Sequence, residues 1–501
     1  MTVFGMVQPV WAGDLLAYVV LGEKGATLTG ETVPVARVVL EPAQDAACAT
    51  MTMTNGQGSP IQLVLRPNPN PTEMPVTVCE AALPFAANHQ ARGETWTVTD
   101  GKSGKQYKVQ LPSVGRSPEV AVILGDSGCR GNKAQPCTDK DWPLPTVMAK
   151  QMGAYLAKEN KPAVILHVGD FKYRGKQDDS GKPQKWSNWK ADFFTPMSGS
   201  ENVFAMAPLV VARGNHELCK SMGNNGDGWY FLLDPTSRVA GNTEQQVKDH
   251  SCQGVADGMT RPYRLDFAND WSVVVLDTAS LNETTTICDT DKEILAGWYK
   301  EIGKSFSSGK RKAWLVTHKP TWAVLGKCDK FDFSNPTPQA ALEGLPHNTL
   351  PENIKLALVG HKHLYASMDV NPEDEKSRML ELVAGNGGVV LNTKALSGCL
   401  KTGKKTAINA HGMSRFGFVA GRLNGGKSVD GWKLEVMAFK NVAGGGDWGG
   451  LVTAEKCEFP AKSGKPACEI KAADLFAKSC SSCEKADGKP GHACAAEDGD
   501  E

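Results

Sequence analysis

Five short apolar runs, each followed by a polar motif, constrain the fold of this chain more than any other feature. The runs cover residues 119–124, 163–167, 209–212, 313–316 and 356–359. They are rich in Val, Ile, Leu and Ala, which is typical of strands that are covered on both faces and need no polar alternation. Helical segments expected at residues 145–159 and 292–307 lie between them. The pattern predicts an α/β core.

The motifs that follow the runs carry side chains able to do chemistry. They are Gly125-Asp126-Ser127-Gly128, Gly169-Asp170-Phe171-Lys172-Tyr173, Gly214-Asn215-His216-Glu217, Val316-Thr317-His318 and Gly360-His361-Lys362-His363. A single Gly-Asp or Gly-His pair after a strand is most often only a turn. If the strands run the same way, however, their carboxyl ends meet at one edge. Five such motifs in order therefore predict one shared site.

The donor set of this site suits two metal ions. Carboxylate, amide and imidazole groups bind hard or borderline cations, and no thiol lies in the motifs. One Asp carboxylate can bridge two cations and hold them roughly 3.5 to 4 Å apart, the spacing that suits an in-line phosphoryl displacement. The cations would lower the pKa of a bound water and neutralise charge on the phosphate oxygens. The sequence thus predicts a two-metal phosphoesterase.

The order and wording of the motifs resemble the calcineurin-like metallophosphoesterases and, within them, the purple acid phosphatases. Most of that superfamily has Asp-x-His in the first motif, whereas Gly128 stands here in place of the histidine. In the purple acid phosphatase branch a tyrosine three residues after the bridging Asp fills the vacancy, and Tyr173 matches it. The resemblance covers residues 120–422 and implies a metallophosphoesterase-type four-layer αββα sandwich core.

The resemblance also implies how the residues divide between the two ions. A phenolate is a hard anionic donor that favours a trivalent ion. Asp170 would bridge both ions and take part in catalysis. The Fe(III) ion would be held by Asp126, Asp170, Tyr173 and His363, and a divalent partner (Fe, Zn or Mn) by Asp170, Asn215, His318 and His361. Formal charges then leave the site near plus one, which attracts a phosphate dianion.

Three further residues are candidates for substrate contact. By the same resemblance, His216 would bind the phosphate or protonate the leaving alkoxide, a role that suits an imidazole. Arg130 and Arg213 are candidates because a guanidinium matches the geometry of a phosphate group. For both residues, the alternative is a solvated or ion-paired loop arginine. Residues 319–328 contain no histidine, although the family places histidines there.

The main functional hypothesis is a hydrolase that cleaves phosphomonoesters by in-line attack of metal-activated hydroxide. A phosphodiesterase with the same metals is an alternative, because the motifs define the ions and not the pocket for the leaving group. A binding or scaffold protein with a lapsed site is a third hypothesis, but all expected ligands are present. An aspartyl-phosphate enzyme with Asp126 as nucleophile would need a second Asp where Gly128 stands.

Several residues have a structural alternative. His167 lies inside an apolar run and is expected to be a buried core histidine. The aromatic stripe over residues 185–194 has helical spacing and is expected to pack on the sheet. For the motif residues themselves the alternative is a set of strand-end turns, and for Tyr173 it is a ring packed on a loop.

Three zones divide the 501 residues: a β-rich N-terminal domain at 1–118, a catalytic domain at 119–443 and a Gly/Cys-rich extension at 444–501. The 55 basic and 55 acidic residues balance, so the charge argues against a nucleic-acid partner and leaves a small-molecule phosphate ester. No apolar stretch reaches the length of a membrane span. Oligomeric state is left open.

Fourteen cysteines favour an oxidising compartment and hence a secreted or periplasmic protein, although no signal peptide is visible in this chain. Nearness in sequence suggests the pairs Cys48–Cys79, Cys129–Cys137, Cys219–Cys252 and Cys288–Cys328. In the extension, Cys480-Ser-Ser-Cys483 fits disulfide stapling, a zinc site with His492, or a redox pair.

Overall fold

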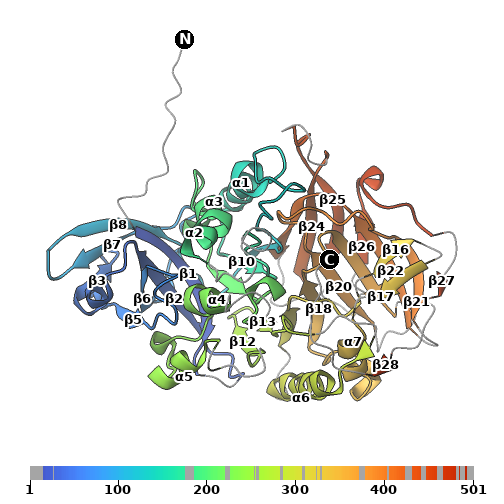
Figure 1. Ribbon diagram of the computed structural model, residues 1–501, viewed down its shortest axis with the longest axis horizontal. Coiled ribbons are helices and arrows are strands. Elements are labelled where there is room, and N and C mark those ends of the chain that lie inside the picture. Colours follow the sequence, from blue (N-terminus) through green and yellow to red (C-terminus); the bar gives the residue numbers. More distant parts are fainter. Residues whose placement is uncertain are drawn as a thin grey trace, which may run out of the picture.

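The computed structural model describes most of the chain. The described residues are 15–25, 28–174, 185–219, 226–252, 254, 259–281, 286–306, 311–322, 324–327, 330–333, 335–371, 378–402, 406–423, 431–441, 447–459, 467–480, 484–485 and 491–492. Two large sheets dominate this part of the chain, with few helices (Figure 1). The result is a mixed α/β fold.

The larger sheet, called sheet A, has eleven strands and contains the first three apolar runs as parallel neighbours. Its strands, in spatial order, are β26 (Ala467–Ile470), β25 (Leu451–Glu458), β24 (Trp432–Phe439), β23 (Gly417–Leu423), β9 (Val120–Leu124), β10 (Ala163–His167), β11 (Leu209–Val211), β1 (Leu15–Glu23), β2 (Thr32–Leu40), β6 (Thr77–Ala82) and β5 (Val64–Arg66). All residues of β9, β10 and β11 are buried, as the unbroken apolar runs predict.

The second sheet, called sheet B, has nine strands and contains the other two runs, which also pair in parallel. Its strands, in spatial order, are β12 (Tyr263–Asp266), β13 (Trp271–Val275), β15 (Lys312–Val316), β18 (Ile354–Val359), β20 (Met379–Ala384), β19 (Tyr365–Val370), β22 (Thr406–Met413), β21 (Gly398–Thr402) and β27 (Glu484–Lys485). The five predicted strands are therefore confirmed, but they are divided between two sheets.

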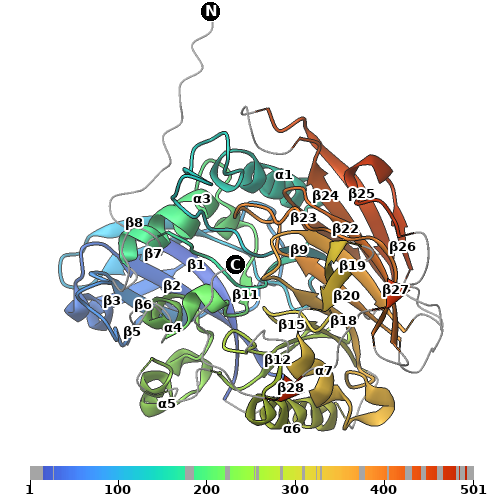
Figure 2. The ribbon, with the colours of Figure 1, turned by 45° about the vertical axis from the view of Figure 1, so that its right-hand side comes forward.

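Three clusters of buried apolar side chains hold the layers together. One cluster joins residues of both sheets, including Trp271 and Trp314 of sheet B and Trp432 of sheet A, whose rings lie 4.8–4.9 Å apart. The other two clusters join the opposite faces of the sheets to helices. Sheet A packs in this way against α1, and sheet B against α6 and α7, so the helices lie on opposite sides of the paired sheets (Figures 1 and 2).

The helices agree with the predicted segments. The segment expected at 145–159 forms a π-turn, η2 (Leu144–Met148), that continues into α1 (Ala149–Glu159), and the segment expected at 292–307 is α6 (Asp289–Ser305). The aromatic stripe forms α2 (Trp186–Trp189), η3 (Lys190–Phe194) and α3 (Thr195–Met197). The remaining helices are α4 (Gly226–Leu232), α5 (Glu244–Asp249) and α7 (Pro336–Leu342).

The N-terminal zone is built into sheet A. β1 pairs in parallel with β11, and β2, β6 and β5 extend the sheet from there. A smaller four-stranded sheet is formed by β3 (Met51–Thr54), β4 (Ile61–Gln62), β7 (Glu94–Asp100) and β8 (Gln106–Leu111). The boundary expected at residue 118 is therefore not a boundary between sheets, because the backbone hydrogen bonds of sheet A cross it.

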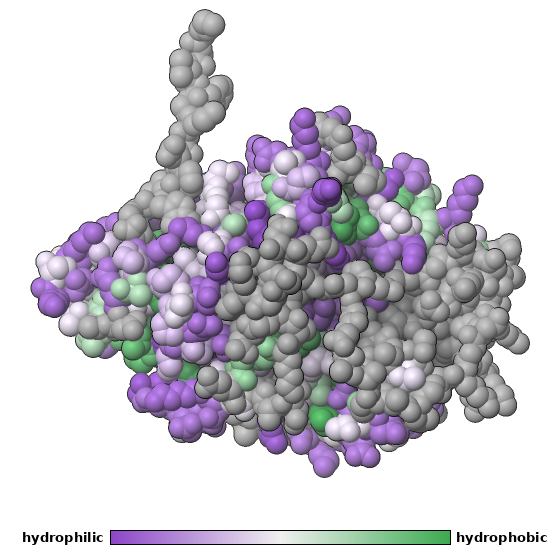
Figure 3. Space-filling view, viewed as in Figure 1, coloured by the Kyte–Doolittle hydropathy of each residue, from purple (hydrophilic) through white to green (hydrophobic). Residues whose placement is uncertain are grey.

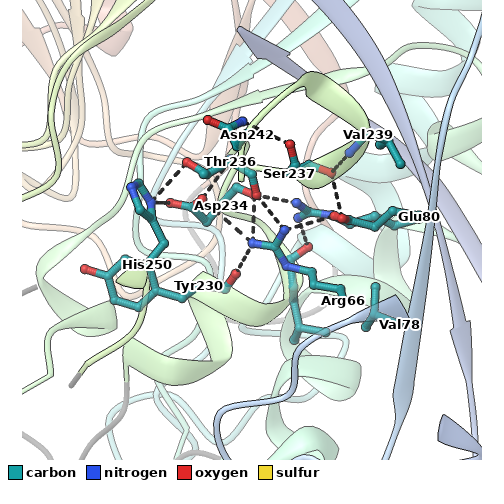
Figure 4. Close-up of polar contacts among 12 residues, drawn as sticks. Arg66, Val78, Glu80, Tyr230, Asp234, Thr236, Ser237, Val239, Asn242 and His250 are labelled. Carbon is teal, nitrogen blue, oxygen red and sulfur yellow. Dashed lines mark hydrogen bonds and ion pairs between the residues drawn. The ribbon is translucent and has the colours of Figure 1, made fainter. Parts of the chain in front are cut away.

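A buried ionic network ties these strands to the segment after α4 (Figure 4). Glu80 accepts from Arg37 at 3.0 Å and from Arg66 at 2.9 Å, and all three side chains are almost fully buried. Ser237 donates to the other oxygen of Glu80 at 2.6 Å, and Arg66 also lies 3.8 Å from Asp234. We call Arg37, Arg66, Glu80, Asp234 and Ser237 the arginine network.

The start of the C-terminal extension also continues the sheets. β25 and β26 are the outer strands of sheet A, and β27 adds to sheet B. β28 (Gly491–His492) pairs with β14 (Thr286–Ile287) beside α6, while β16 (Val324–Lys327) and β17 (Lys330–Phe333) form a separate hairpin. Sheet A therefore includes strands from both sides of the boundary expected at residue 444, because β25 pairs with β24.

Disulfides agree with the sequence pattern. The pairs Cys48–Cys79, Cys129–Cys137 and Cys219–Cys252 are confirmed, and Cys457 pairs with Cys468 between neighbouring strands. The suggested partner of Cys288, Cys328, lies outside the described residues, as do Cys483 and Cys494 of the extension. Among the described cysteines none is free.

The described surface is mainly hydrophilic, with apolar residues in scattered small patches on the face drawn in Figure 3. Leu65 is the one large hydrophobic residue classed as exposed in the described ranges. The described helices include none that is long and apolar enough to cross a membrane.

Candidate active site

The five motifs meet where the carboxyl ends of the parallel strands of both sheets come together. The loops after β9 and β10 are joined by hydrogen bonds from Asp126 N to Gly169 O at 2.9 Å and from Ser127 N to Asp170 O at 3.0 Å. Across the sheets, His318 Nδ1 lies 2.8 Å from the carbonyl oxygen of Val168, and His361 N donates to Asp126 Oδ2 at 2.9 Å. Strand ends of two sheets therefore build one cluster.

One half of the cluster surrounds the hydroxyl of Tyr173. This oxygen lies 3.0 Å from Asp126 Oδ1 and 2.8 Å from Asp170 Oδ2. It also lies 3.1 Å from His363 Nε2. A phenol has one proton, so it can donate to only one of these three atoms. The other contacts need a proton from His363 Nε2 or from Asp126, whose pKa is raised, and a bound cation could take the place of these protons.

The other half surrounds the side-chain oxygen of Asn215. It lies 2.8 Å from His318 Nε2 and 2.8 Å from His361 Nδ1. Because a carbonyl oxygen only accepts, the His318 Nδ1 beside Val168 O carries a proton, and Nε2 is the atom that faces Asn215. This is the orientation of a metal-binding imidazole, whose second nitrogen donates to a backbone carbonyl.

Asp170 belongs to both halves. Potential ligand atoms form two groups, Asp126–Asp170–His363 and Asp170–His318–His361. Within each group, the ligand atoms all lie within 4.8 Å of one another. Carboxylate oxygens and imidazole nitrogens are suitable donors for two neighbouring cations, with the shared carboxylate between them. A third group, Glu455 with Cys457 and Cys468, does not fit a metal because its two sulfurs form a disulfide.

The pKa values report a concentrated negative potential. Burial lowers the pKa of His318, but Asp170 more than offsets this and raises it to about 9. Burial and the charge of Asp170 raise the pKa of Asp126 well above its usual range. Burial also lowers the pKa of His363 well below its usual range, with Arg130 acting in the same direction. The site thus favours positive charge near Asp170 and neutral imidazole at His363.

The backbone at the site is strained where these groups turn inward. Asp126, Asp170 and His361 have φ values of 54°, 57° and 69°. These values lie in the left-handed region that residues other than glycine rarely adopt. Such conformations persist when the surrounding structure fixes them, and they concentrate at functional sites. The hydrogen bonds between the loops supply that constraint here.

Gly128 and Gly214 are required by close approach. A Cβ at Gly128 would lie 2.8 Å from Lys172 Cα and 2.9 Å from Tyr173 N, so any other residue there would displace the loop that carries Tyr173. A Cβ at Gly214 would lie 2.0 Å from Asp170 Oδ1. The glycines let two motif loops touch.

His216 and Arg130 lie beside Tyr173. The ring centroid of His216 is 4.1 Å from that of Tyr173, and its backbone N–H donates to Asp170 Oδ1 at 2.9 Å. The guanidinium carbon of Arg130 lies 5.8 Å from the centroid of the Tyr173 ring. His216 and Arg130 are therefore within the cluster. Arg213 is not available in the same way, because its buried guanidinium pairs with Asp277 at 2.9 Å and donates to Tyr230 at 2.6 Å.

His167 is a core histidine, as expected. It is fully buried, its ring stacks on Phe171 at 3.8 Å, and Nδ1 accepts from Gly169 N at 3.3 Å. Nε2 therefore carries the proton and donates to Ser127 Oγ at 2.8 Å. Burial lowers the pKa of His167 to about 3, so the ring is neutral.

Two buried carboxylates that the sequence analysis did not single out support the motif loops. Glu217 accepts the backbone N–H groups of Gly214, Asp170 and Phe171 at 3.0, 3.2 and 3.1 Å. Asp192 accepts from Tyr173 N at 3.1 Å and Arg174 N at 3.2 Å. Two sequence signals could have pointed to these residues: Glu217 lies inside a motif, and Asp192 is an acidic residue within the aromatic stripe.

Residues 122–365 match the family model described as calcineurin-like phosphoesterase. A search of curated proteins finds no match for the chain. The matched range begins within β9 and ends at the start of β19, and it includes all the motif residues described above. Enzymes of this family are metal-dependent hydrolases of phosphoric esters, and the donor set found here fits metal ions. Over this range, which is just under half of the 501 residues, the chain carries a calcineurin-like phosphoesterase domain.

Proposed function

We propose that the protein hydrolyses phosphomonoesters by in-line attack of hydroxide at phosphorus, in the manner of the purple acid phosphatases. The observation that carries the proposal is the shared position of Asp170 between two groups of potential metal ligands. Bound there, two cations would supply hydroxide near neutral pH and neutralise charge on the phosphate oxygens. The chain's own residues would hold the ions, orient the phosphate and move the leaving-group proton.

Tyr173 supports the assignment to the purple acid phosphatase branch. Its hydroxyl faces Asp126, Asp170 and His363 at distances of 2.8–3.1 Å. Gly128 could not be a histidine without moving the Tyr173 loop, because a Cβ there would meet the backbone of residues 171–173. The absence of a histidine at position 128 and the presence of Tyr173 are thus structurally linked. Asp126, Asp170, Tyr173 and His363 would hold Fe(III).

The second ion would be divalent and held by Asp170, Asn215, His318 and His361. No thiolate lies in this group, and its oxygen and nitrogen atoms suit Fe, Zn or Mn. The hydrogen bond between His318 Nδ1 and Val168 O fixes the imidazole with Nε2 toward the site.

His216 and Arg130 would act on the substrate. The His216 ring is held against Tyr173 by packing, and its backbone is held by Asp170. In this place an imidazolium could donate to a phosphate oxygen and then protonate the departing alkoxide. Arg130 is only partly buried beside the same ring, where its guanidinium could pair with phosphate oxygens.

The remaining expectations are proposals of the same kind. The clusters of buried residues on both faces of the two sheets favour a four-layer αββα sandwich. Four described disulfides are compatible with a secreted or periplasmic protein. The substrate would be a small-molecule phosphate ester.

Turnover of a monoester and a diester of one chromophore tests the reaction. We expect a kcat/KM for the monoester well above that for the diester; the reverse order would make the protein a phosphodiesterase on the same metal site. Elemental analysis with a visible spectrum tests the ions. A colourless protein with two tightly bound zinc or manganese ions would contradict the ferric-phenolate assignment.

A further inference from the structure

The loop that carries Tyr173 is held from two directions. On one side, Phe171 inserts into buried rings, with centroid distances of 3.8 Å to His167 and 4.9 Å to Phe193. On the other side, the loop backbone meets Asp192, which is completely buried on η3. Phe171 and Asp192 therefore bracket Tyr173 and connect it to the packed helical segment.

Asp192 contacts the loop through both of its carboxylate oxygens. Oδ2 accepts from the adjacent backbone groups Tyr173 N at 3.1 Å and Arg174 N at 3.2 Å. Oδ1 pairs with the guanidinium of Arg174, whose other face lies over the ring of Trp142. Two adjacent N–H groups on one oxygen fix the orientation of the peptide between them, and hence the direction in which the Tyr173 side chain leaves the backbone.

We propose that Asp192 is a positioning residue that sets the place of the Tyr173 hydroxyl and so controls how firmly the ferric half of the site holds its ion. This inference rests on the proposed function, because it requires Tyr173 to be a metal ligand. The aromatic stripe then has a role beyond packing, because it holds the carboxylate of Asp192 in place. Without that carboxylate, the buried N–H groups of residues 173 and 174 would be left unpaired, which the loop can avoid only by moving.

Asp277 offers a matched control on the other half of the site. It is also buried, accepts the backbone N–H groups of Thr260 and Ala279 at 2.8 and 3.0 Å, and pairs with Arg213 at 2.9 Å. Arg213 lies two residues before Asn215, on the divalent half. Both carboxylates thus accept two backbone N–H groups and pair with an arginine, but Asp277 lies beside Arg213 rather than beside the Tyr173 loop.

The experiment compares Asp192→Asn and Asp277→Asn in the metal-loaded protein. An asparagine has the shape of the aspartate, but its NH2 group cannot accept, so one set of contacts is lost. We expect Asp192→Asn to shift the ferric-phenolate absorption band and to speed ferric release to a chelator roughly 10- to 100-fold, with release of the divalent ion unchanged. Asp277→Asn should give the opposite pattern. Glu31→Gln, in an exposed ion pair with Lys24, should change neither.

Two results would overturn the positioning role of Asp192. One is a wild-type band and wild-type ferric release in the folded Asp192→Asn variant; the other is equal loss of both ions, which would make Asp192 merely structural. If Asp192→Asn does not fold, Arg174→Gln decides, because Arg174 is partly exposed and contacts the other oxygen. It should speed ferric release about 3-fold, and an unchanged rate would reject the proposal. A wild type with no band would instead reject the ferric-phenolate assignment and with it the positioning role of Asp192, whereas the proposed hydrolase activity is tested separately by monoester and diester turnover.

Discussion

In the described structure, the arginine network and the candidate active site are two polar clusters that are built in opposite ways. In the arginine network, each charged group meets a partner of opposite charge: Glu80 faces Arg37 and Arg66, and Asp234 faces Arg66 (Figure 4). In the candidate active site, acidic groups lie together instead: the Tyr173 hydroxyl oxygen is 3.0 Å from Asp126 Oδ1 and 2.8 Å from Asp170 Oδ2. The arginine network is almost fully buried, whereas Asn215, His361 and His363 of the site are only partly buried.

The comparison shows how the pKa shifts of buried carboxyl groups indicate a cation site. In the arginine network, Arg66 and Arg37 outweigh the effect of burial and lower the pKa of Glu80, as expected of a carboxylate with its own cations. In the site, burial and a like charge raise the pKa of Asp126. Among the described ligand groups, the raised pKa of His318 favours its charged form beside the carboxylates of Asp126 and Asp170, and bound cations would stabilise the negative charge that remains.

Among the variants of the two clusters, Asp170→Asn should have the largest effect, and it acts on the candidate active site. Loss of the shared carboxylate charge should lower kcat/KM on the order of 10⁴-fold and remove paired metal binding. The unfolding free energy of the metal-free protein should fall, because the burial of His318 is offset by its pairing with Asp170, which raises its pKa, although the substitution also removes repulsion with Asp126. Steady-state kinetics, metal analysis and urea unfolding test this; retained activity with two bound ions would contradict the bridging role.

Glu80→Gln should have its effect on stability instead. It leaves two buried guanidinium groups without their shared carboxylate, and breaking a buried pair in this way costs about 3–5 kcal/mol of unfolding free energy. The kcat of the folded protein should stay the same, because Glu80 does not contact the site loops in the described structure. Urea unfolding beside kinetics on the native fraction measures both. A stability loss below about 1 kcal/mol would remove the contrast between the clusters.

His216→Ala should separate metal holding from substrate contact within the site. We expect kcat to fall roughly 10²- to 10³-fold while both ions are retained, since the proposed task of His216 is proton transfer. His216→Gln, which keeps a hydrogen-bond donor, should recover part of the loss in KM but not in kcat. An equal loss of metal and activity in His216→Ala would make the histidine a structural residue.

The smallest effect is expected at the rim of the arginine network. His250 Nδ1 lies 3.1 Å from Asp234 Oδ2, and although burial lowers the pKa of His250, Asp234 raises it above its usual value. A raised pKa gives stability that is fully present below about pH 6.5 and is lost as the pH rises through the folded-state pKa. His250→Asn should therefore cost about 1 kcal/mol or less at pH 5.5 and nothing at pH 9.

Urea unfolding of wild type and His250→Asn across this pH range checks the sign. A cost that grows with pH would show that the neutral imidazole is the stabilising form, and that the contact between His250 and Thr236 at 3.0 Å matters more than the ion pair.

Much of this organisation follows from local sequence. The five strands, the helical segments at 145–159, 185–194 and 292–307 and three disulfide pairs were predicted, because apolar runs, helical spacing and nearness along the chain are local signals. The motif residues were predicted to lie together because parallel strands end at one edge. The apolar pattern did not predict how those strands divide between two sheets, since the same buried pattern fits either sheet; two sheets were expected only from the family resemblance, which implies an αββα core.

The supporting carboxylates could not be found in this way. Asp192 contacts a loop eighteen residues earlier, and Glu80 contacts Ser237 at a separation of 157 residues. A buried Asp or Glu has no local pattern that announces it, because its burial is made possible by donors from distant parts of the chain.

The sequence by itself determined the chemistry: which donors stand at the strand ends, the glycines that let the backbone turn, and the tyrosine that accompanies a missing histidine. Only the tertiary structure decided that the N-terminal strands extend sheet A, that an arginine network fastens them, and that Asp192 accepts from the backbone of the loop that carries Tyr173. The physical reason is that ligand type is a property of single residues, whereas the place of a ligand depends on hydrogen bonds and packing between segments that are remote along the chain.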